Sequence, residues 1–180
     1  MYRIKIYLID INKNIVSSWK REFLNVEDVI IKLEDLKSFL DCNINDIKAI
    51  VSPGNSYGIM NGGFDLAITN YFGNQLSNNV SKYIKEHFYP YQSVGSSFII
   101  DIPNYKNIKL IHTPTMIVPS TIFDEKVIYN CMYNTLMCAF NNNITSIVIP
   151  AFGGATGGVD PKVIAREMRL AYNDFIKYVY

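Results

Sequence analysis

The sequence predicts an α/β fold in which a mostly parallel sheet is covered by helices on both faces. Three observations lead to this prediction. Segments with strand-like apolar patterns alternate with segments of helical periodicity, two glycine-rich loops each follow a strand pattern directly, and no repeat or linker interrupts the chain. The 180 residues are close to the usual size of one domain, which we expect to span residues 1–180. Hydrophobic residues make up 49% of the chain and provide ample material for a core.

The expected strands are short runs of alternating or continuous apolar residues. The first run alternates between polar and apolar side chains, whereas the last is continuously apolar and ends at Pro150, as expected for a buried strand. Strands are predicted over residues 3–9, 29–33, 47–52, 96–101, 108–112 and 144–149.

Helical periodicity fills the segments between these strands. Residues 10–24 carry apolar side chains at Ile11, Ile15, Trp19 and Phe23, a four-residue recurrence that suits one face of a helix. Pro161 opens the last predicted helix, because proline suits the first helical turn. Further helices are predicted over residues 35–40 as a short turn, and over residues 64–71, 76–88 and 123–140.

Charge and cysteine content argue against several functional classes. A formal net charge of +1 argues against strong sequence-independent binding to nucleic acid. The three cysteines form neither a metal-binding spacing nor a disulfide framework, so we expect free thiols, no metal and no cofactor. The apolar runs are too short to span a bilayer, and no leader pattern opens the chain. We therefore expect an intracellular protein of the cytoplasm or nucleus.

The first glycine-rich loop, residues 52–65, lies between a predicted strand and a predicted helix. Its four glycines let the backbone approach a ligand closely and adopt positive φ. Asn55 offers a donor and an acceptor, as recognition of a sugar diol requires. Asp65 lies in the first turn of the helix, where the helix dipole stabilises a carboxylate. The alternative interpretation is that Asn55 only forms a turn and Asp65 is only a helix-start acid.

The second glycine-rich loop, residues 153–158, lies between a buried strand and a helix. Its consecutive glycines expose backbone N–H groups, the helix start adds positive potential, and Thr156 adds a hydroxyl, so the loop suits a diphosphate. It is not a Walker loop, because no Gly-Lys-Ser/Thr follows. Since ligands of such sheets sit at the carboxyl ends of the strands, we expect both loops to open on the same edge.

Taken together, the two loops resemble those of macrodomains. The segment Ala-Ile-Val-Ser-Pro-Gly-Asn-Ser-Tyr-Gly at residues 49–58 resembles the macrodomain segment D-A-I-V-N-A-A-N, in a subgroup where Ser-Pro replaces Asn-Ala. Residues 61–68 are similar to G-G-G-V-D-x-A-I, and residues 150–161 to the loop that wraps the diphosphate. The resemblance covers about residues 29–172. It implies a three-layer αβα fold with a mixed, mostly parallel sheet of about six strands.

The resemblance also implies a pocket for ADP-ribose. Asn55 would bind the distal ribose, and Asp35 would accept a hydrogen bond from the adenine amino group. Gly62, Gly63 and Phe64 would line the ribose and the diphosphate. The diphosphate would be held by the second loop, through Gly153, Gly154, Ala155, Thr156, Gly157 and Gly158. The aromatic residue that stacks on adenine is not identified, because Gly157 stands near the place where many members of the family carry one.

The resemblance leaves open whether the protein is an enzyme or a reader. Members that remove ADP-ribose from acidic side chains carry an Asp in the place of Asp65, which would position or deprotonate a water molecule. Asn55 and Asp65 are therefore the candidate catalytic residues, for hydrolysis of a mono-ADP-ribosyl adduct or of ADP-ribose 1″-phosphate. Thr69 stands where such members often have a histidine, which favours a non-catalytic reader of ADP-ribosylated partners. His112 is either an acid–base residue or a packed strand residue.

Overall fold

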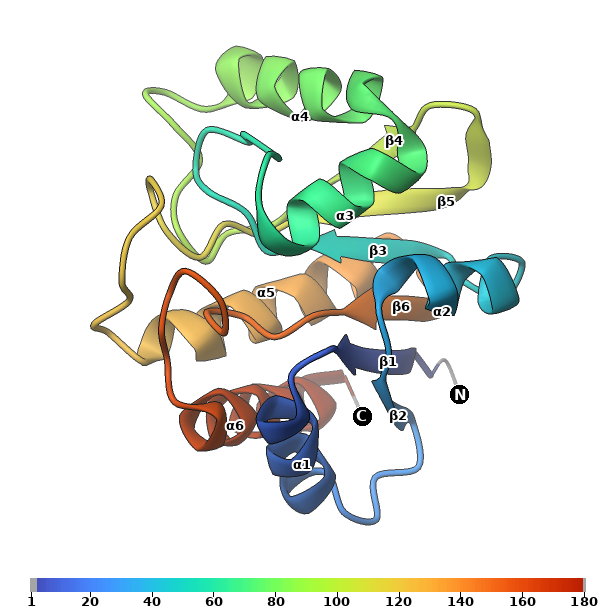
Figure 1. The fold of residues 1–180 in the computed structure, drawn as a ribbon, viewed down its shortest axis with the longest axis vertical. Coiled ribbons are helices and arrows are strands. Elements are labelled where there is room, and N and C mark those ends of the chain that lie inside the picture. The colour runs from blue at the N-terminus through green and yellow to red at the C-terminus, as the bar shows by residue number, and fades with distance from the viewer. Residues whose placement is uncertain (1–2, 180) are drawn as a thin grey trace.

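Within residues 3–179, which the computed structural model describes, six strands form one sheet in the order β2-β1-β6-β3-β5-β4 (Figure 1). The antiparallel pair is β4 with β5, and the other neighbouring strands pair in parallel. The predicted fold class, a mixed and mostly parallel sheet of about six strands, is confirmed. The predicted domain of residues 1–180 also includes Met1, Tyr2 and Tyr180, which lie outside the described residues. The strands are β1 (Lys5–Asp10), β2 (Val29–Leu33), β3 (Ala49–Ser52), β4 (Phe98–Ile102), β5 (Tyr105–His112) and β6 (Ser146–Ile149).

Helices cover both faces of the sheet and enclose two separate apolar cores (Figure 1). Helices α1, α5 and α6 pack on one face, around the fully buried Trp19. Helices α2, α3 and α4 pack on the other, around the fully buried Phe39. None of the helices in residues 3–179 has the length and apolar character of a membrane span. The helices are α1 (Lys13–Glu22), α2 (Leu36–Asn43), α3 (Gly63–Phe72), α4 (Asn74–His87), α5 (Lys126–Asn141) and α6 (Pro161–Val179).

Strand β1 shows how a central strand serves both cores. Successive side chains of a strand point to opposite faces, so Ile6 and Leu8 enter the first core while Tyr7 and Ile9 enter the second. A parallel strand with neighbours on both sides and helices on both faces is buried throughout. The alternation seen in the sequence therefore does not mark a solvent-facing side of β1.

Several element boundaries differ from those predicted, for local reasons. Helix α1 begins at Lys13 instead of residue 10, because the Asn12 side chain accepts a hydrogen bond from the Asn14 amide and caps the helix. Asp10 consequently ends β1. Strand β5 begins at Tyr105 instead of residue 108, because Asn104, with φ of 66°, turns the chain directly from β4 into an antiparallel partner.

Leu8 should contribute strongly to stability, because it is fully buried in the strand between β2 and β6. We expect Leu8→Ala to lower the free energy of unfolding by about 2–5 kcal/mol, as for other buried leucines. Leu24→Ala is the matched control, since Leu24 is 69% exposed, and should change it by less than about 0.5 kcal/mol. Urea unfolding of both variants measures the difference; equal effects would contradict the placement of β1.

Candidate functional site

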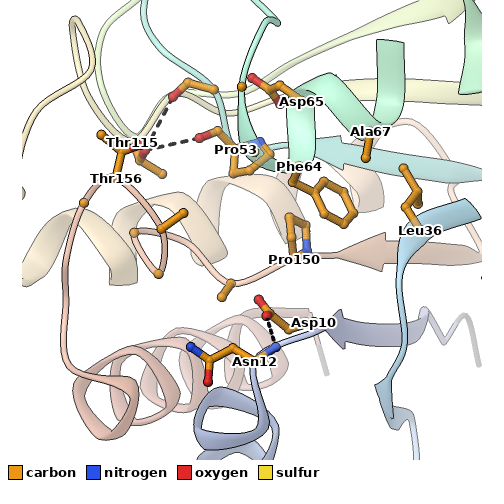
Figure 2. Close-up of a pocket in the computed structure, with 18 of the residues that line it drawn as sticks. Asp10, Asn12, Leu36, Pro53, Phe64, Asp65, Ala67, Thr115, Pro150 and Thr156 are labelled. Carbon is orange, nitrogen blue, oxygen red and sulfur yellow. Dashed lines mark hydrogen bonds between the residues drawn. The ribbon is translucent and has the colours of Figure 1, made fainter. Parts of the chain in front are cut away.

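A pocket of about 550 Å³ lies at the carboxyl ends of three neighbouring parallel strands (Figure 2). Strand β6 pairs with β1 on one side and with β3 on the other, so the segments that follow these strands emerge side by side. The first glycine-rich loop follows β3, and the second follows β6. Both loops line the pocket, as expected from their positions after strands.

Nearly all residues expected to bind ligand line this pocket. The exception is Gly158, which lies beyond the lining of the second loop. The lining includes Asp35, Asn55, Gly62, Gly63, Phe64, Asp65, Gly153, Gly154, Ala155, Thr156 and Gly157. The structure therefore brings together two sets of residues that are about ninety positions apart in the sequence. Their individual roles stay predictions.

Sequence reasoning missed the contribution of the segment after β1. Asp10 and Asn12 line the pocket, and the Asp10 carboxylate accepts a hydrogen bond of 2.7 Å from the Asn12 amide (Figure 2). Burial raises the pKa of Asp10, although backbone amides of Asn12, Ile11 and Ala151 act in the opposite direction. The rule that placed the two glycine loops also applies to β1: polar residues directly after a parallel strand lie at the ligand edge.

The charged side chains of the lining are all acidic. They are Asp10, Glu34, Asp35 and Asp65, and the described lining includes no lysine or arginine. An anionic ligand in this pocket must therefore be held by backbone N–H groups.

The start of α3 supplies such groups. No side chain caps this helix, and its first helical hydrogen bond runs from the Leu66 amide to the Gly62 oxygen, at 3.1 Å. The amides of residues 63–65 precede that bond and so remain available to a ligand. The start of α6 offers fewer free amides to a ligand than the sequence suggested, because the Asp160 carboxylate already accepts a 2.7 Å hydrogen bond from Lys162 N. Its negative charge offsets the helix potential there.

The second loop is folded tightly upon itself. The Val159 amide donates to the Gly153 oxygen at 3.1 Å, and the Ile122 amide donates to the Gly157 oxygen at 2.9 Å. A Cβ on Gly157 would lie 2.8 Å from the Gly153 oxygen and 2.7 Å from Cδ1 of Ile122. A side chain at Gly157 thus collides with the loop's own backbone. In this conformation the loop has no room for an aromatic side chain at Gly157.

The Asn55 side chain is engaged mainly by its own loop. Its Nδ2 donates to the Ile59 oxygen at 2.9 Å, and its Oδ1 accepts from the amides of Tyr57 and Ile59 at 3.1 and 3.3 Å. Asn55 therefore does form a turn. Because an amide group carries two N–H donors, one of them remains for a ligand in the pocket.

The Asp65 carboxyl group is almost entirely buried at the edge of the pocket. Ser52 Oγ donates a 2.7 Å hydrogen bond to its Oδ1, and the residue is 6% exposed. Burial raises the pKa of Asp65 to about 7, against the opposing effect of the Ser52 hydrogen bond. Figure 2 places Asp65 beyond Phe64, at the opposite end of the pocket from Asp10. A carboxyl group with such a pKa can gain or lose a proton near neutral pH.

Thr69 and His112 are both buried, and neither lines the pocket. The Thr69 hydroxyl group is hydrogen-bonded to the backbone oxygens of Met60 and Asp65, at 3.0 and 2.9 Å. It therefore fastens the first loop to α3 without contacting a ligand. Burial lowers the pKa of His112 to about 3, so the imidazole is neutral.

The pocket also has an apolar part. The Phe64 ring lies among Leu36, Ala67 and Pro150, which come from α2, α3 and the end of β6 (Figure 2). Apolar walls of this kind suit a flat, uncharged ring.

A family model described as "Macro-like domain" matches residues 29–177. The chain belongs to the macro-like domain family. The match begins at β2, so β1 and α1, with Asp10 and Asn12, lie outside it. An uncharacterised protein of Aquifex aeolicus is 29% identical over 123 residues, which cover 68% of this chain and 71% of that protein. An uncharacterised protein of Aeropyrum pernix is 27% identical over 124 residues, which cover 69% of this chain and 62% of that protein.

Solved macrodomain structures share this fold. The macrodomain of Mycobacterium tuberculosis DarG superposes with a TM-score of 0.61 at 20% identity, covering 72% of this chain and 83% of that one. The Oceanobacillus iheyensis macrodomain with ADP gives a TM-score of 0.55 at 18% identity, covering 74% and 84%. The Trypanosoma brucei macrodomain in complex with ADP gives a TM-score of 0.56 at 19% identity, covering 71% of this chain and 52% of that one.

The packing of Gly157 predicts a loss of stability on substitution. We expect Gly157→Ala to lower the free energy of unfolding by about 1–3 kcal/mol, because its Cβ would meet backbone atoms that cannot easily move. Gly62→Ser is the control: a Cβ there meets nothing within 4 Å, and serine is a favoured helix cap. Thermal unfolding should show a loss for the first variant alone. Equal stability of both would refute the close contact between Gly157 and Gly153.

Proposed function

We propose that the pocket binds ADP-ribose. The observation that carries the proposal is the convergence of two glycine-rich loops, one of them at an uncapped helix start, on a pocket that has an apolar part and whose described lining includes no basic side chain. A diphosphate needs several N–H donors, and the start of α3 and the second loop supply them. The ADP ligands named for the Oceanobacillus and Trypanosoma macrodomains support the same chemistry.

The adenine ring fits the apolar part of the pocket. Phe64 would stack on it instead of lining the distal ribose and the diphosphate as the resemblance implies, and this would assign the aromatic contact that the sequence left open. Asp35 would accept a hydrogen bond from the adenine amino group. Its carboxylate already accepts hydrogen bonds from the Ser38 amide and hydroxyl, at 2.9 and 2.7 Å, and these lower its pKa. Each carboxylate oxygen has a second lone pair, so an ionised Asp35 can still accept from adenine.

The distal ribose would then lie toward Asn55 and Asp65, which both line the pocket. Figure 2 shows Asp65 just beyond Phe64, on the side of the pocket away from Asp10. The remaining N–H of Asn55 can donate to a ribose hydroxyl. This direction places the anomeric carbon, where a modified protein or a phosphate is attached, near the carboxyl group whose pKa burial raises to about 7. The partner is accordingly ADP-ribose itself or an ADP-ribosylated macromolecule.

Binding is tested first by calorimetric titration with ADP-ribose, with AMP and NAD as comparison ligands. We expect a dissociation constant for ADP-ribose near micromolar, which corresponds to a binding free energy of about −8 kcal/mol, and much weaker binding of both comparison ligands. Asn55→Ala should weaken binding because it removes the ribose contact. Absence of heat and of any thermal shift with ADP-ribose would refute the pocket assignment.

Hydrolysis of an ADP-ribosyl derivative is the second part of the proposal, with a mono-ADP-ribosyl adduct or ADP-ribose 1″-phosphate as substrate. Ionised Asp65 would take a proton from a water molecule beside the anomeric carbon or the phosphate, and the diphosphate contacts would hold the substrate in place. A non-catalytic reader is the competing proposal. It is supported by Thr69, which is buried and bonded to backbone oxygens in the place where hydrolytic members often have a histidine.

The role of Asp65 is tested by Asp65→Asn, which keeps the shape of the side chain but removes its ability to take up a proton. We expect turnover to fall about 100-fold or more while ADP-ribose affinity is largely retained. In the wild type, kcat/KM should rise with pH and level off above the pKa of about 7, because the base must be ionised. Turnover that survives in Asp65→Asn would exclude the carboxylate role, and wild-type protein without turnover would favour the reader.

A further inference from the structure

His112 carries a polar atom that the proposed site does not use. The side chain is fully buried at the end of β5, and its Nε2 has no hydrogen-bond partner among the described residues. A buried polar atom without a partner costs about 1–3 kcal/mol, so native proteins rarely leave one.

The hydrogen bonds of Gln92 determine which form of the imidazole is present. Gln92 Nε2 donates to the backbone oxygens of Ser96 and His112, at 3.0 and 3.3 Å. Its Oε1 therefore faces His112 Nδ1, at 2.6 Å, and must accept the Nδ1 proton. The neutral ring consequently presents a bare lone pair at Nε2.

This lone pair and the Asp65 carboxyl group face the same small space beside Gly54. A Cβ built on Gly54 would lie 2.5 Å from Asp65 Oδ2, 3.0 Å from His112 Nε2 and 3.4 Å from Ser52 Oγ. Three polar atoms from β3, α3 and β5 thus surround the position of Gly54, where the first loop lacks a side chain. Any residue other than glycine at this position would fill the space between the acid and the base.

We propose that Asp65 and His112 share one proton across this space through one water molecule, with Asp65 Oδ2 as donor and His112 Nε2 as acceptor, because Nε2 has no direct hydrogen-bond partner among the described residues. The hydrogen bonds then balance: Ser52 donates to Oδ1, Oδ2–H donates to the water molecule, the water donates to Nε2, and Nδ1–H donates to Gln92. Transfer of the proton would give a carboxylate and an imidazolium, so the pair keeps a net charge of zero in either form.

The pair makes His112 a positioning residue that acts through Asp65. An acceptor at Nε2 stabilises the protonated carboxyl group, holds Oδ2 away from solvent and supports the Gly54 backbone directly before Asn55. The other side chains facing the pair are uncharged: Ser52 from β3, Gln92, and Phe98 from β4, whose ring centroid is 5.3 Å from that of His112. The positioning role of His112 in catalysis rests on the proposed function, whereas the pairing of Asp65 with His112 requires no ligand.

The pair also predicts how stability depends on pH. In the folded protein, between a pH of about 3 and a pH of about 7, Asp65 is protonated and His112 is neutral. In the unfolded chain, between the ordinary values of 3.8 and 6.5, the Asp is ionised and the His is charged. Both states then bind one proton, so the pair adds no pH dependence in this range.

Removing either Asp65 or His112 should make stability depend on pH, because the folded and unfolded states then bind different numbers of protons. In Asp65→Asn the buried His112 remains, its folded pKa is lowered, and its contribution to stability is lost as pH falls below 6.5. In His112→Gln the buried Asp65 remains, its folded pKa is raised, and its contribution is lost as pH rises from about 4 toward 7. Urea unfolding at a series of pH values should therefore give slopes of opposite sign for the two variants. Parallel slopes would overturn the proposal.

The direct measurement is nitrogen NMR of the histidine rings in the wild-type protein without ligand. The chain has two histidines, and the exposed His87 serves as an internal reference. We expect His112 to remain neutral and protonated at Nδ1 from pH 5 to 8, with the chemical shift of a hydrogen-bonded Nε2. A proton on Nε2 in the neutral ring, or the shift of an Nε2 without a hydrogen bond, would overturn the proposal.

Two substitutions at Asp65 separate a hydrogen bond from mere packing. The amide of Asp65→Asn can accept from Ser52 and donate to the water molecule that bridges to His112, so the Nε2 signal and the melting temperature at pH 8 should be retained. Asp65→Leu offers no donor, so Nε2 should lose its hydrogen-bonded shift and the melting temperature should fall. Equal Nε2 shifts in both variants would refute the pair. These measurements need no ADP-ribose, so their failure would leave the proposed function untouched.

Discussion

The parallel pairing of β6 with both β1 and β3 is the constraint on which the site depends. Parallel neighbours end at the same edge of a sheet, so three polar or glycine-rich segments from distant parts of the chain emerge next to one another. The pairing is secured by side chains that are buried on both faces, such as Val148 in one core and Ile147 in the other. The apolar interior and the ligand edge are thus consequences of the same strand order.

The pocket relies on backbone geometry instead of side-chain charge. Four carboxyl groups line it, and a diphosphate among them depends on amide donors whose positions are fixed by the loops. This explains why the packing of Gly157 against Gly153 matters as much as any polar side chain. It also favours ligands that spread their negative charge over many oxygen atoms, as a diphosphate does.

Buried polar side chains hold the first loop in place. Thr69 ties it to α3, Ser52 binds Asp65, and Asn55 closes its own turn. A carboxyl group kept in such surroundings gains the raised pKa that acid–base chemistry at neutral pH requires, but only because desolvation outweighs the Ser52 hydrogen bond. The same burial leaves little of the Asp65 carboxyl group open to the pocket, so its raised pKa and its accessibility both depend on how the first loop is held.

Much of this fold can be predicted from the sequence, because strands, helices and loops are determined mainly by residues that are close together in the chain. Apolar periodicity indicated the strands and most helices, and glycine runs after strands indicated both loops that line the pocket, although Gly158 lies just beyond the lining. Boundaries were less certain, because a single cap such as Asn12 or a turn such as Asn104 moves them.

Only the tertiary structure decided which distant residues meet. It brought Asp10 and the second loop to one pocket, placed Phe64 among Leu36 and Pro150, and put His112 beside Gly54 and Asp65. No periodicity or spacing encodes these contacts, because they arise from strand order and from packing across the sheet. The sequence by itself determined the elements and the chemistry of the loops; the fold determined how they form one pocket.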